Sequence, residues 1–296
     1  MKRAAIAIGS NSTRMLAADV RDQALWSIVR GREETRLFLG LDADGSIRPE
    51  RLEQTAQAVC RLYRQAVDWG AQDVALLATS ATRDAKNGKA LGERIFALCG
   101  LTLRVISGEE EARLAFLAAS QGRRRLVMDI GGGSTEWTLG ENNRVEWAVS
   151  MQLGASRLLK RRKIENEADA EACLALAREI MAPNAEKLRA LPPAPVLVGL
   201  GGSCTTAASL FLRRQVHGEE AEGIEVSLTE AKRQLALLAP MTLEERMRVP
   251  GLLPTRAAHY PHGLCILIAA LETLGFDSLT VSGRSNLDGY LLSQTE

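Results

Sequence analysis

Aromatic side chains are scarce in this sequence: Phe, Trp and Tyr together make up 4% of its 296 residues. A surface that stacks the bases of single-stranded nucleic acid needs several exposed aromatic rings. The net charge is +1 at pH 7, so no strong positive field attracts a nucleic acid or an anionic membrane surface. The composition therefore argues against both nucleic-acid binding and membrane binding.

Long apolar runs and paired cysteines are also missing. No run of about 18 apolar residues is present, which argues against a transmembrane helix, and the N-terminus enters a strand-like segment without signal-peptide organisation. The five cysteines are scattered and form no C-x-x-C pair. Reduced, unpaired thiols are typical of cytoplasmic proteins, so we expect a cytoplasmic location.

The sequence also lacks a G-x-x-x-x-G-K-[ST] segment, which excludes a P-loop enzyme. It has instead two glycine-rich loops that align without a gap, Gly9-Ser10-Asn11-Ser12-Thr13 and Gly131-Gly132-Gly133-Ser134-Thr135. Each follows an apolar run and precedes another strand-like run, so each is expected to join two strands of a hairpin. Backbone N–H groups and hydroxyls in such a turn can bind phosphate, and glycine permits its close approach. The two copies predict a duplicated domain with a phosphate held between the halves.

The order of expected elements supports this duplication. Strands are expected at 4–9, 13–20 and 24–32, followed by alternating helices and strands that include a strand over 101–106, and a similar order begins again at residue 126. Such alternation indicates an α/β fold, while a glycine loop inside a hairpin is not that of a dinucleotide-binding unit. A polar, basic stretch at 121–125 marks the boundary between domains at 1–120 and 121–296. As an alternative for the last helix, we consider that it packs back on the first domain.

Two carboxylates flank the second glycine loop. Asp129 ends a buried strand, and Glu136 stands just beyond the loop hydroxyls. Mg²⁺ is typically held by one or two protein carboxylates together with substrate oxygens. We therefore predict a Mg²⁺ site at Asp129 and Glu136. The alternative, an ordinary turn rich in glycine and serine, is weakened by the matching first loop.

Three consecutive glutamates, Glu109, Glu110 and Glu111, fill the first turn of a helix expected over 108–119. Acidic side chains in a first turn are favoured by the helix dipole and need no further function. One of them would act in catalysis only if it faced the substrate. The residues by themselves do not distinguish among the three.

Three other features have two interpretations each. Arg83 is either a bidentate phosphate clamp or a solvated loop arginine. The turn Gly201-Gly202-Ser203 either holds an anion at a helix N-terminus or makes a tight connection. His259 and His262 are too few for a zinc site, which needs three or four ligands, so a surface or packing role is favoured.

Taken in order, several segments resemble the exopolyphosphatase/guanosine pentaphosphate phosphohydrolase (Ppx/GppA) family in its short two-domain form. That family belongs to the actin-like ATPase superfamily, whose sugar kinases and actins share the two loops but not the segment at 106–114. The resemblance implies two duplicated ribonuclease-H-like α/β domains with a cleft between them. It rests on these segments: Gly9-Ser10-Asn11-Ser12-x-Arg14, Thr79-Ser80-Ala81-x-Arg83-Asp84-Ala85-x-Asn87, Ile106-Ser107-Gly108-x-Glu110-Glu111-Ala112-Arg113-Leu114, Asp129 through Glu136, Leu153-Gly154-Ala155-x-Arg157-Leu158, and Gly199-x-Gly201-Gly202-Ser203.

The resemblance also implies roles for individual residues. Glu111 matches the glutamate that activates water against a terminal phosphate, and Asp129 and Glu136 match residues that hold Mg²⁺. The implied substrate is inorganic polyphosphate or a guanosine penta- or tetraphosphate, and we expect a homodimer. The expected phosphate-binding residues are Gly9, Ser10, Asn11, Ser12, Arg83, Gly131, Gly132, Gly133, Ser134 and Thr135.

The chain departs from the family pattern at places close to this site. The first loop usually begins Asp-x-Gly-Ser-Asn-Ser, but here Ala7 stands at the Asp position, opposite Asp129 of the second loop. The segments 256–258 and 282–289 also differ from the family's Arg-Ala-Asp and Ser-x-x-Gly-Leu-Arg-Glu-Gly. A missing carboxylate predicts weaker Mg²⁺ binding and lower turnover, with Ala7→Asp raising turnover. The alternative function is therefore a weakly catalytic or non-catalytic sensor that binds polyphosphate or (p)ppGpp.

Overall fold

A computed structural model of the chain describes residues 1–294 and divides it into two compact units. The first unit contains residues 1–118 and the C-terminal segment that begins at Asn286. The second unit is Ala119–Ser285. The sequence predicts a domain boundary at residue 120, and the two units divide after Ala118. The last helix belongs to the first unit.

The first unit is built on a five-stranded sheet in the order β3-β2-β1-β4-β5. β1, β2 and β3 form an antiparallel meander, while β4 and β5 run parallel to β1. The strands are β1 (Lys2–Ile8), β2 (Thr13–Arg21), β3 (Ala24–Glu33), β4 (Asp73–Ala78) and β5 (Leu103–Val105). The helices are α1 (Pro49–Trp69), α2 (Ser80–Asp84), α3 (Gly88–Cys99), α4 (Gly108–Ala119) and α11 (Asn286–Leu292), with a 3-10 turn at Phe38–Gly40.

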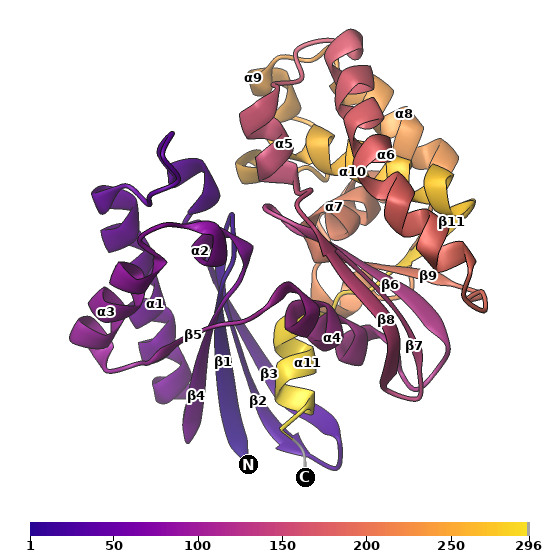
Figure 1. Cartoon of the computed structure of the whole chain (residues 1–296). Coiled ribbons are helices and arrows are strands. Elements are labelled where there is room, and N and C mark those ends of the chain that lie inside the picture. Colours follow the sequence, from indigo (N-terminus) through magenta and orange to yellow (C-terminus); the bar gives the residue numbers. More distant parts are fainter. Residues whose placement is uncertain (295–296) are drawn as a thin grey trace. The chain divides into compact units, whose positions relative to one another are not determined.

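The two faces of this sheet are covered by different helices, as Figure 1 shows. Alternate side chains of a strand point to opposite faces. On β1, Ala4, Ile6 and Ile8 therefore pack against α1 and α3. Ala5 and Ala7 point the other way, into an apolar cluster that includes Leu287 and Leu291 of α11.

An ion pair between a buried acid and an exposed arginine connects the C-terminal helix to β3. Asp288 is only 1% exposed, and its carboxylate lies 2.7 Å from the guanidinium of Arg30 on β3. Next to it, Gly289 lies directly against the backbone carbonyl of Leu114, and a side chain at this position would overlap that carbonyl. The helix therefore needs both the acid and the glycine to lie against β3 and α4.

The second unit contains a six-stranded sheet in the order β10-β11-β9-β6-β7-β8. One face carries its large apolar core, to which α6, α7, α8 and α10 contribute. The strands are β6 (Arg125–Ile130), β7 (Thr135–Glu141), β8 (Arg144–Met151), β9 (Leu197–Leu200), β10 (Glu225–Ser227) and β11 (Ser278–Val281). The helices are α5 (Ala155–Arg161), α6 (Glu167–Arg189), α7 (Gly201–Phe211), α8 (Leu228–Leu238), α9 (Leu243–Arg246) and α10 (Tyr260–Leu274), with 3-10 turns at Gly218–Ala221 and Pro254–Arg256.

The α/β fold predicted from the sequence is confirmed, with three local differences. The segment expected as a loop around Arg83 is the short helix α2, and the strand expected over 101–106 is reduced to Leu103–Val105. β10 was not predicted, because a three-residue strand has no periodicity of its own and exists through its pairing with β11.

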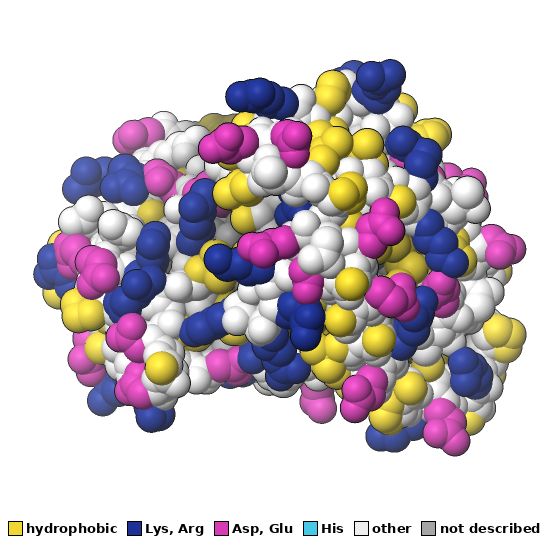
Figure 2. All heavy atoms as spheres, turned by 90° about the horizontal axis from the view of Figure 1, so that it is seen from above, with side chains coloured by type: hydrophobic (Ala, Val, Ile, Leu, Met, Phe, Trp, Pro, Cys, Tyr) yellow, Lys and Arg dark blue, Asp and Glu magenta, His cyan; other side chains and the backbone are white. Residues whose placement is uncertain are grey.

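Charged side chains of both signs are interspersed over the face seen in Figure 2, in keeping with the net charge of +1. Within residues 1–294, no helix combines the length and the apolar character needed to cross a bilayer.

Candidate phosphate and hydrolytic site

The two glycine loops adopt the same backbone turn. The N–H of Gly9 donates to the carbonyl of Ser12 at 3.1 Å, and the N–H of Gly131 donates to the carbonyl of Ser134 at 2.9 Å. At either glycine, a Cβ atom would lie 3.0 Å from that same carbonyl oxygen, which is tight for any side chain. The gap-free sequence match therefore corresponds to one turn geometry, used once in each unit.

Each loop is held by hydrogen bonds to its carbonyl groups. In the first loop, the carbonyls of Ser10 and Asn11 accept from the N–H groups of Phe38 and Arg36 at 2.8 and 2.7 Å. Fixing the carbonyls in this way sets the orientation of the peptide planes. No described residue accepts a hydrogen bond from the N–H groups of residues 10–12, so these donors are available to an anion.

The second loop is held in the same manner by the segment that follows β8. The Gly131 carbonyl accepts from Ala155 N–H at 3.0 Å, and the Gly133 carbonyl accepts from Arg157 Nε at 2.6 Å. Gly154 lies against the loop backbone so closely that a side chain there would overlap it. The N–H groups of residues 132–134 likewise donate to no described residue.

The hydroxyl of Thr135 supports the loop from within the fold. Thr135 is fully buried at the start of β7, and its hydroxyl donates to the Leu153 carbonyl at 2.6 Å. The hydroxyl proton is therefore already used within the protein, and the assignment of Thr135 as a phosphate-binding residue stays a prediction. In the first loop, Ser10 and Ser80 share a buried hydroxyl–hydroxyl hydrogen bond of 3.0 Å. That bond links the loop to the first residue of α2.

The two carboxylates beside the second loop are neighbours. Asp129 on β6 and Glu136 on β7 are register partners in an antiparallel pair, and they are 8% and 2% exposed. Such partners share one face of the sheet, with Cβ atoms about 5 Å apart, and like charges there repel. Glu136 also accepts from the Ser150 hydroxyl at 2.6 Å.

This donor set fits the predicted Mg²⁺, which takes hard oxygen ligands and keeps several from water or substrate. Among the residues that the structure describes, no group of three His, Cys, Asp or Glu side chains is arranged to hold a metal ion. A cation at Asp129 and Glu136 would therefore depend on two carboxylates and on oxygens from outside the chain.

The three glutamates of α4 occupy different environments. Glu109 is exposed, and Glu110 pairs with Arg104. Glu111 is 8% exposed, and its Oε2 lies 3.6 Å from Nη1 of Arg83. Only Glu111 of the three thus combines burial with a cation that can bind phosphate.

A hydrogen bond to a backbone carbonyl of the same unit holds the Arg83 side chain in place. It lies in the last turn of α2, and its Nη1 donates to the Ile106 carbonyl at 2.9 Å. Its side chain is 22% exposed, so it is not the freely solvated arginine considered above. Nitrogen donors of the guanidinium that remain in solvent would suit the oxygens of a phosphate group.

The family model described as the Ppx/GppA phosphatase family matches residues 16–296. The chain belongs to the Ppx/GppA phosphatase family. A guanosine-5'-triphosphate,3'-diphosphate pyrophosphatase of Vibrio parahaemolyticus is 29% identical over 305 residues, covering 99% of this chain. The chain spans only 59% of the length of that relative.

Solved structures of the family share the fold. The PPX-GPPA enzyme of Aquifex aeolicus has a TM-score of 0.82 at 27% identity, with 99% of both chains covered. An exopolyphosphatase of Cytophaga hutchinsonii has a TM-score of 0.89 at 24% identity, covering 100% of this chain and 99% of its own. The actin-like α/β fold implied by the sequence resemblance is therefore confirmed.

Ala7 stands where the Ppx/GppA family usually has an aspartate, but its surroundings in this chain are apolar. Ala7 is 1% exposed and belongs to the apolar cluster on the face of β1 that α11 covers. Its register partner on β2 is Arg14, whose Nη2 donates to Asn286 Oδ1 at 3.4 Å. The first unit thus pairs alanine with arginine where the second unit pairs Asp129 with Glu136.

That environment changes the expected effect of Ala7→Asp. The new carboxylate would be buried among alkyl groups, with Arg14 as its register partner on β2, so we expect the free energy of unfolding to fall by about 2 kcal/mol or more and turnover not to rise. Urea denaturation and phosphate release measure the two effects. Ala5→Asp, on the same face but two residues farther from the loop, serves as the control and should cost more. An Ala7→Asp protein as stable as the parent and faster would contradict this expectation.

Sequence reasoning did not single out Arg256 as a binding residue. Its guanidinium lies against Gly202 at the start of α7, where any side chain at Gly202 would overlap it. The N-terminus of a helix and a guanidinium both suit an anion. The signal in the sequence was the family's Arg-Ala-Asp segment, of which this chain keeps the arginine.

The histidines favoured for packing are buried. His259 is 7% exposed and His262 is fully buried, with Nε2 of His262 donating to the Arg162 carbonyl at 2.8 Å. Burial lowers the pKa of His262 to about 4, so its ring is neutral at pH 7. This agrees with a packing role.

Proposed function

We propose that the chain hydrolyses a terminal phosphoanhydride bond of an anionic phosphate chain, either guanosine pentaphosphate or inorganic polyphosphate. The observation that carries the proposal is the ion pair between buried Glu111 and partly exposed Arg83, in the same unit as the first glycine loop. The name of the Vibrio relative, a guanosine-5'-triphosphate,3'-diphosphate pyrophosphatase, and the family described as phosphatases support the same chemistry.

In this reaction, a water molecule attacks the terminal phosphorus and the bridging P–O bond breaks. Glu111 orients the water and accepts its proton late, while the shortened phosphate chain leaves as the anion. Arg83 and the loop N–H groups would bind the phosphoryl oxygens as charge shifts in the transition state. A Mg²⁺ ion bound by Asp129 and Glu136 would supply further charge neutralisation on the phosphate oxygens.

The alternative proposal is a sensor that binds polyphosphate or (p)ppGpp and turns it over slowly. It is favoured by one observation, the replacement of the first-loop carboxylate by Ala7. The expected homodimer and the cytoplasmic location stay predictions under either function.

The test is phosphate release from guanosine pentaphosphate and from inorganic polyphosphate, each with Mg²⁺ and with a chelator. The hydrolase predicts Mg²⁺-dependent release from at least one of them. Equilibrium binding is measured in parallel with Glu111→Gln, which should bind but not cleave. Binding without cleavage by the parent would favour the sensor. A parent that neither binds nor cleaves these substrates would overturn both proposals.

A further inference from the structure

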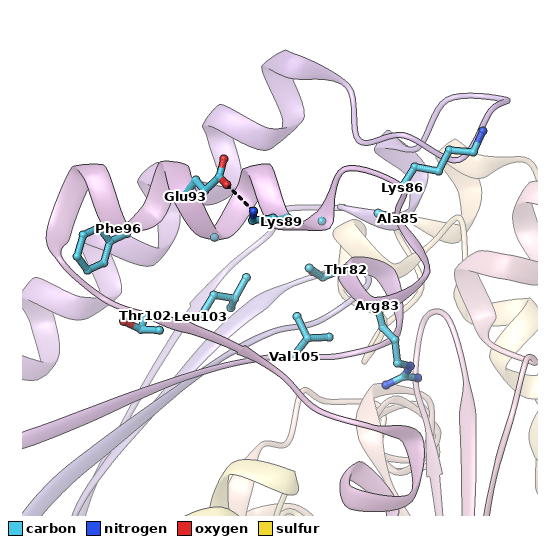
Figure 3. Close-up of a pocket in the computed structure, with 12 residues that line it drawn as sticks. Thr82, Arg83, Ala85, Lys86, Lys89, Glu93, Phe96, Thr102, Leu103 and Val105 are labelled. Carbon is cyan, nitrogen blue, oxygen red and sulfur yellow. Dashed lines mark ion pairs between the residues drawn. The ribbon is translucent and has the colours of Figure 1, made fainter.

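Two cavities among the described residues differ in their relation to the proposed hydrolytic site. The cavity between α3 and β5 of the first unit has a volume of about 650 Å³ and is lined by Arg83, so it borders that site (Figure 3). The second cavity, of about 410 Å³, lies in the second unit between the end of α5 and the segment that joins α8 to α9. We call it the α5/α9 cavity, and the proposed hydrolysis does not use it.

The α5/α9 cavity is lined mainly by apolar side chains. Ile164 is buried, whereas Leu243 is 50% exposed and therefore lies at the opening. A cavity of this size, with apolar walls and a few polar groups, is typical of a small-molecule site. The apolar lining consists of Leu159, Ile164, Pro240, Met241, Leu243 and Ala258.

One of the cations that line this cavity is buried. Arg246 is the last residue of α9 and is only 5% exposed. Its Nε donates to the Leu238 carbonyl at 2.9 Å, and its Nη2 donates to the carbonyls of Ile164 and Ala239 at 2.7 and 3.1 Å. These hydrogen bonds hold the guanidinium in place beside the cavity.

The charge of Arg246 is not neutralised by a nearby carboxylate. Within residues 1–294, it has no ion pair, and no group accepts a hydrogen bond from its Nη1. Nη1 is not sealed from solvent, so its N–H groups are available to a ligand in the cavity. Burial lowers the pKa of Arg246, and the charge of Glu165 acts in the opposite direction. A buried cation without a counter-ion is costly, and an anion that pairs with it relieves that cost.

The other charged residues of the lining define the charge that a ligand should carry. Lys163 is exposed and forms no ion pair with a described residue, and Glu165 is also exposed. The lining thus contains two cations, Lys163 and Arg246, and one carboxylate, which gives a net charge of +1. A single negative charge matches this lining. A chain of phosphates would bring excess negative charge and no apolar surface.

We propose that the α5/α9 cavity binds a small amphipathic monocarboxylate. Its carboxylate pairs with Arg246 and Lys163, because a guanidinium and a carboxylate form strong, charge-assisted hydrogen bonds. Its alkyl tail lies against the apolar lining and is removed from water. This site is independent of the proposed function, since none of its residues belongs to the hydrolytic site.

The first test is calorimetric titration of the parent with hexanoate, octanoate and decanoate, each below its micelle concentration. We expect one saturable site per chain, with an affinity that rises about fourfold for each added CH₂ group. Octan-1-ol has the octanoate tail without the charge and should bind at least about tenfold more weakly than octanoate. The proposal is overturned if decanoate shows no saturable binding, or if octan-1-ol binds as tightly as octanoate.

The second test locates the site without replacing Arg246, whose guanidinium also holds three backbone carbonyls. Leu243→Glu places a negative charge at the opening and should weaken decanoate binding about tenfold, while Lys163→Gln should weaken it about threefold. Met247→Glu is the matched control for Leu243→Glu, because Met247 is 43% exposed, lies four residues further along the chain and does not line the cavity. Unchanged affinity in Leu243→Glu, or equal weakening by Leu243→Glu and Met247→Glu, would place the carboxylate elsewhere and refute the assignment.

Discussion

Glu111→Gln is expected to lower kcat about a thousandfold while leaving substrate affinity within about twofold of the parent, as for loss of a general base. The amide keeps the size and the burial of the side chain but neither accepts a proton nor carries the charge that pairs with Arg83. Steady-state phosphate release gives kcat, and equilibrium binding of the uncleaved substrate gives affinity.

The controls for Glu111 are its neighbours on the same helical turn. Glu109 is exposed and Glu110 pairs with Arg104, so Glu109→Gln and Glu110→Gln should keep kcat within about threefold, as expected for surface changes. An equal loss from Glu109→Gln would show that the wrong glutamate has been assigned. Full activity in Glu111→Gln would refute the assignment directly.

Asp129→Asn is expected to have opposite effects on stability and on activity. In the presence of a chelator, the variant should be more stable than the parent by about 0.5 kcal/mol, because it removes one of two adjacent buried carboxylates. Adding Mg²⁺ should stabilise the parent, and it should stabilise the variant much less. Turnover should fall at least about a hundredfold, since the metal and its charge neutralisation are lost.

Thermal unfolding with Mg²⁺ and with chelator measures the stability effects independently of turnover. Glu141→Gln, a change at an exposed carboxylate at the far end of β7, should respond to Mg²⁺ as the parent does. If the parent unfolds at the same temperature in Mg²⁺ and in chelator, Asp129 and Glu136 do not hold the ion.

Much of the fold was predictable because its signals are local. A turn that places a backbone carbonyl 3.0 Å from the Cβ position selects glycine, so Gly9 and Gly131 mark their loops in the sequence. Apolar periodicity marked the long helices and the buried strands. β10 was missed because its three residues are ordered by pairing with β11.

The site was less predictable because it depends on what packs against each residue. Thr135 matches Thr13 in the loop alignment, but only the fold shows that its hydroxyl donates to the Leu153 carbonyl, 18 residues away. Arg256 was marked in the sequence only by the family's Arg-Ala-Asp segment, and it reaches the start of α7 only through the fold of the second unit. Ala7 looked like a missing metal ligand, yet α11 from the end of the chain covers its face of β1.

By itself, the sequence determined the two glycine loops, the α/β alternation and the family, because glycine requirements and apolar periodicity act over a few residues. Only the tertiary structure decided which glutamate of three meets Arg83, since that depends on the rotation of α4 about its axis when it packs on the sheet. The same holds for the cavity between α3 and β5, whose walls come from separate elements. Gly92 of α3 meets Leu103 of β5 only when the two elements pack together, which no single segment encodes.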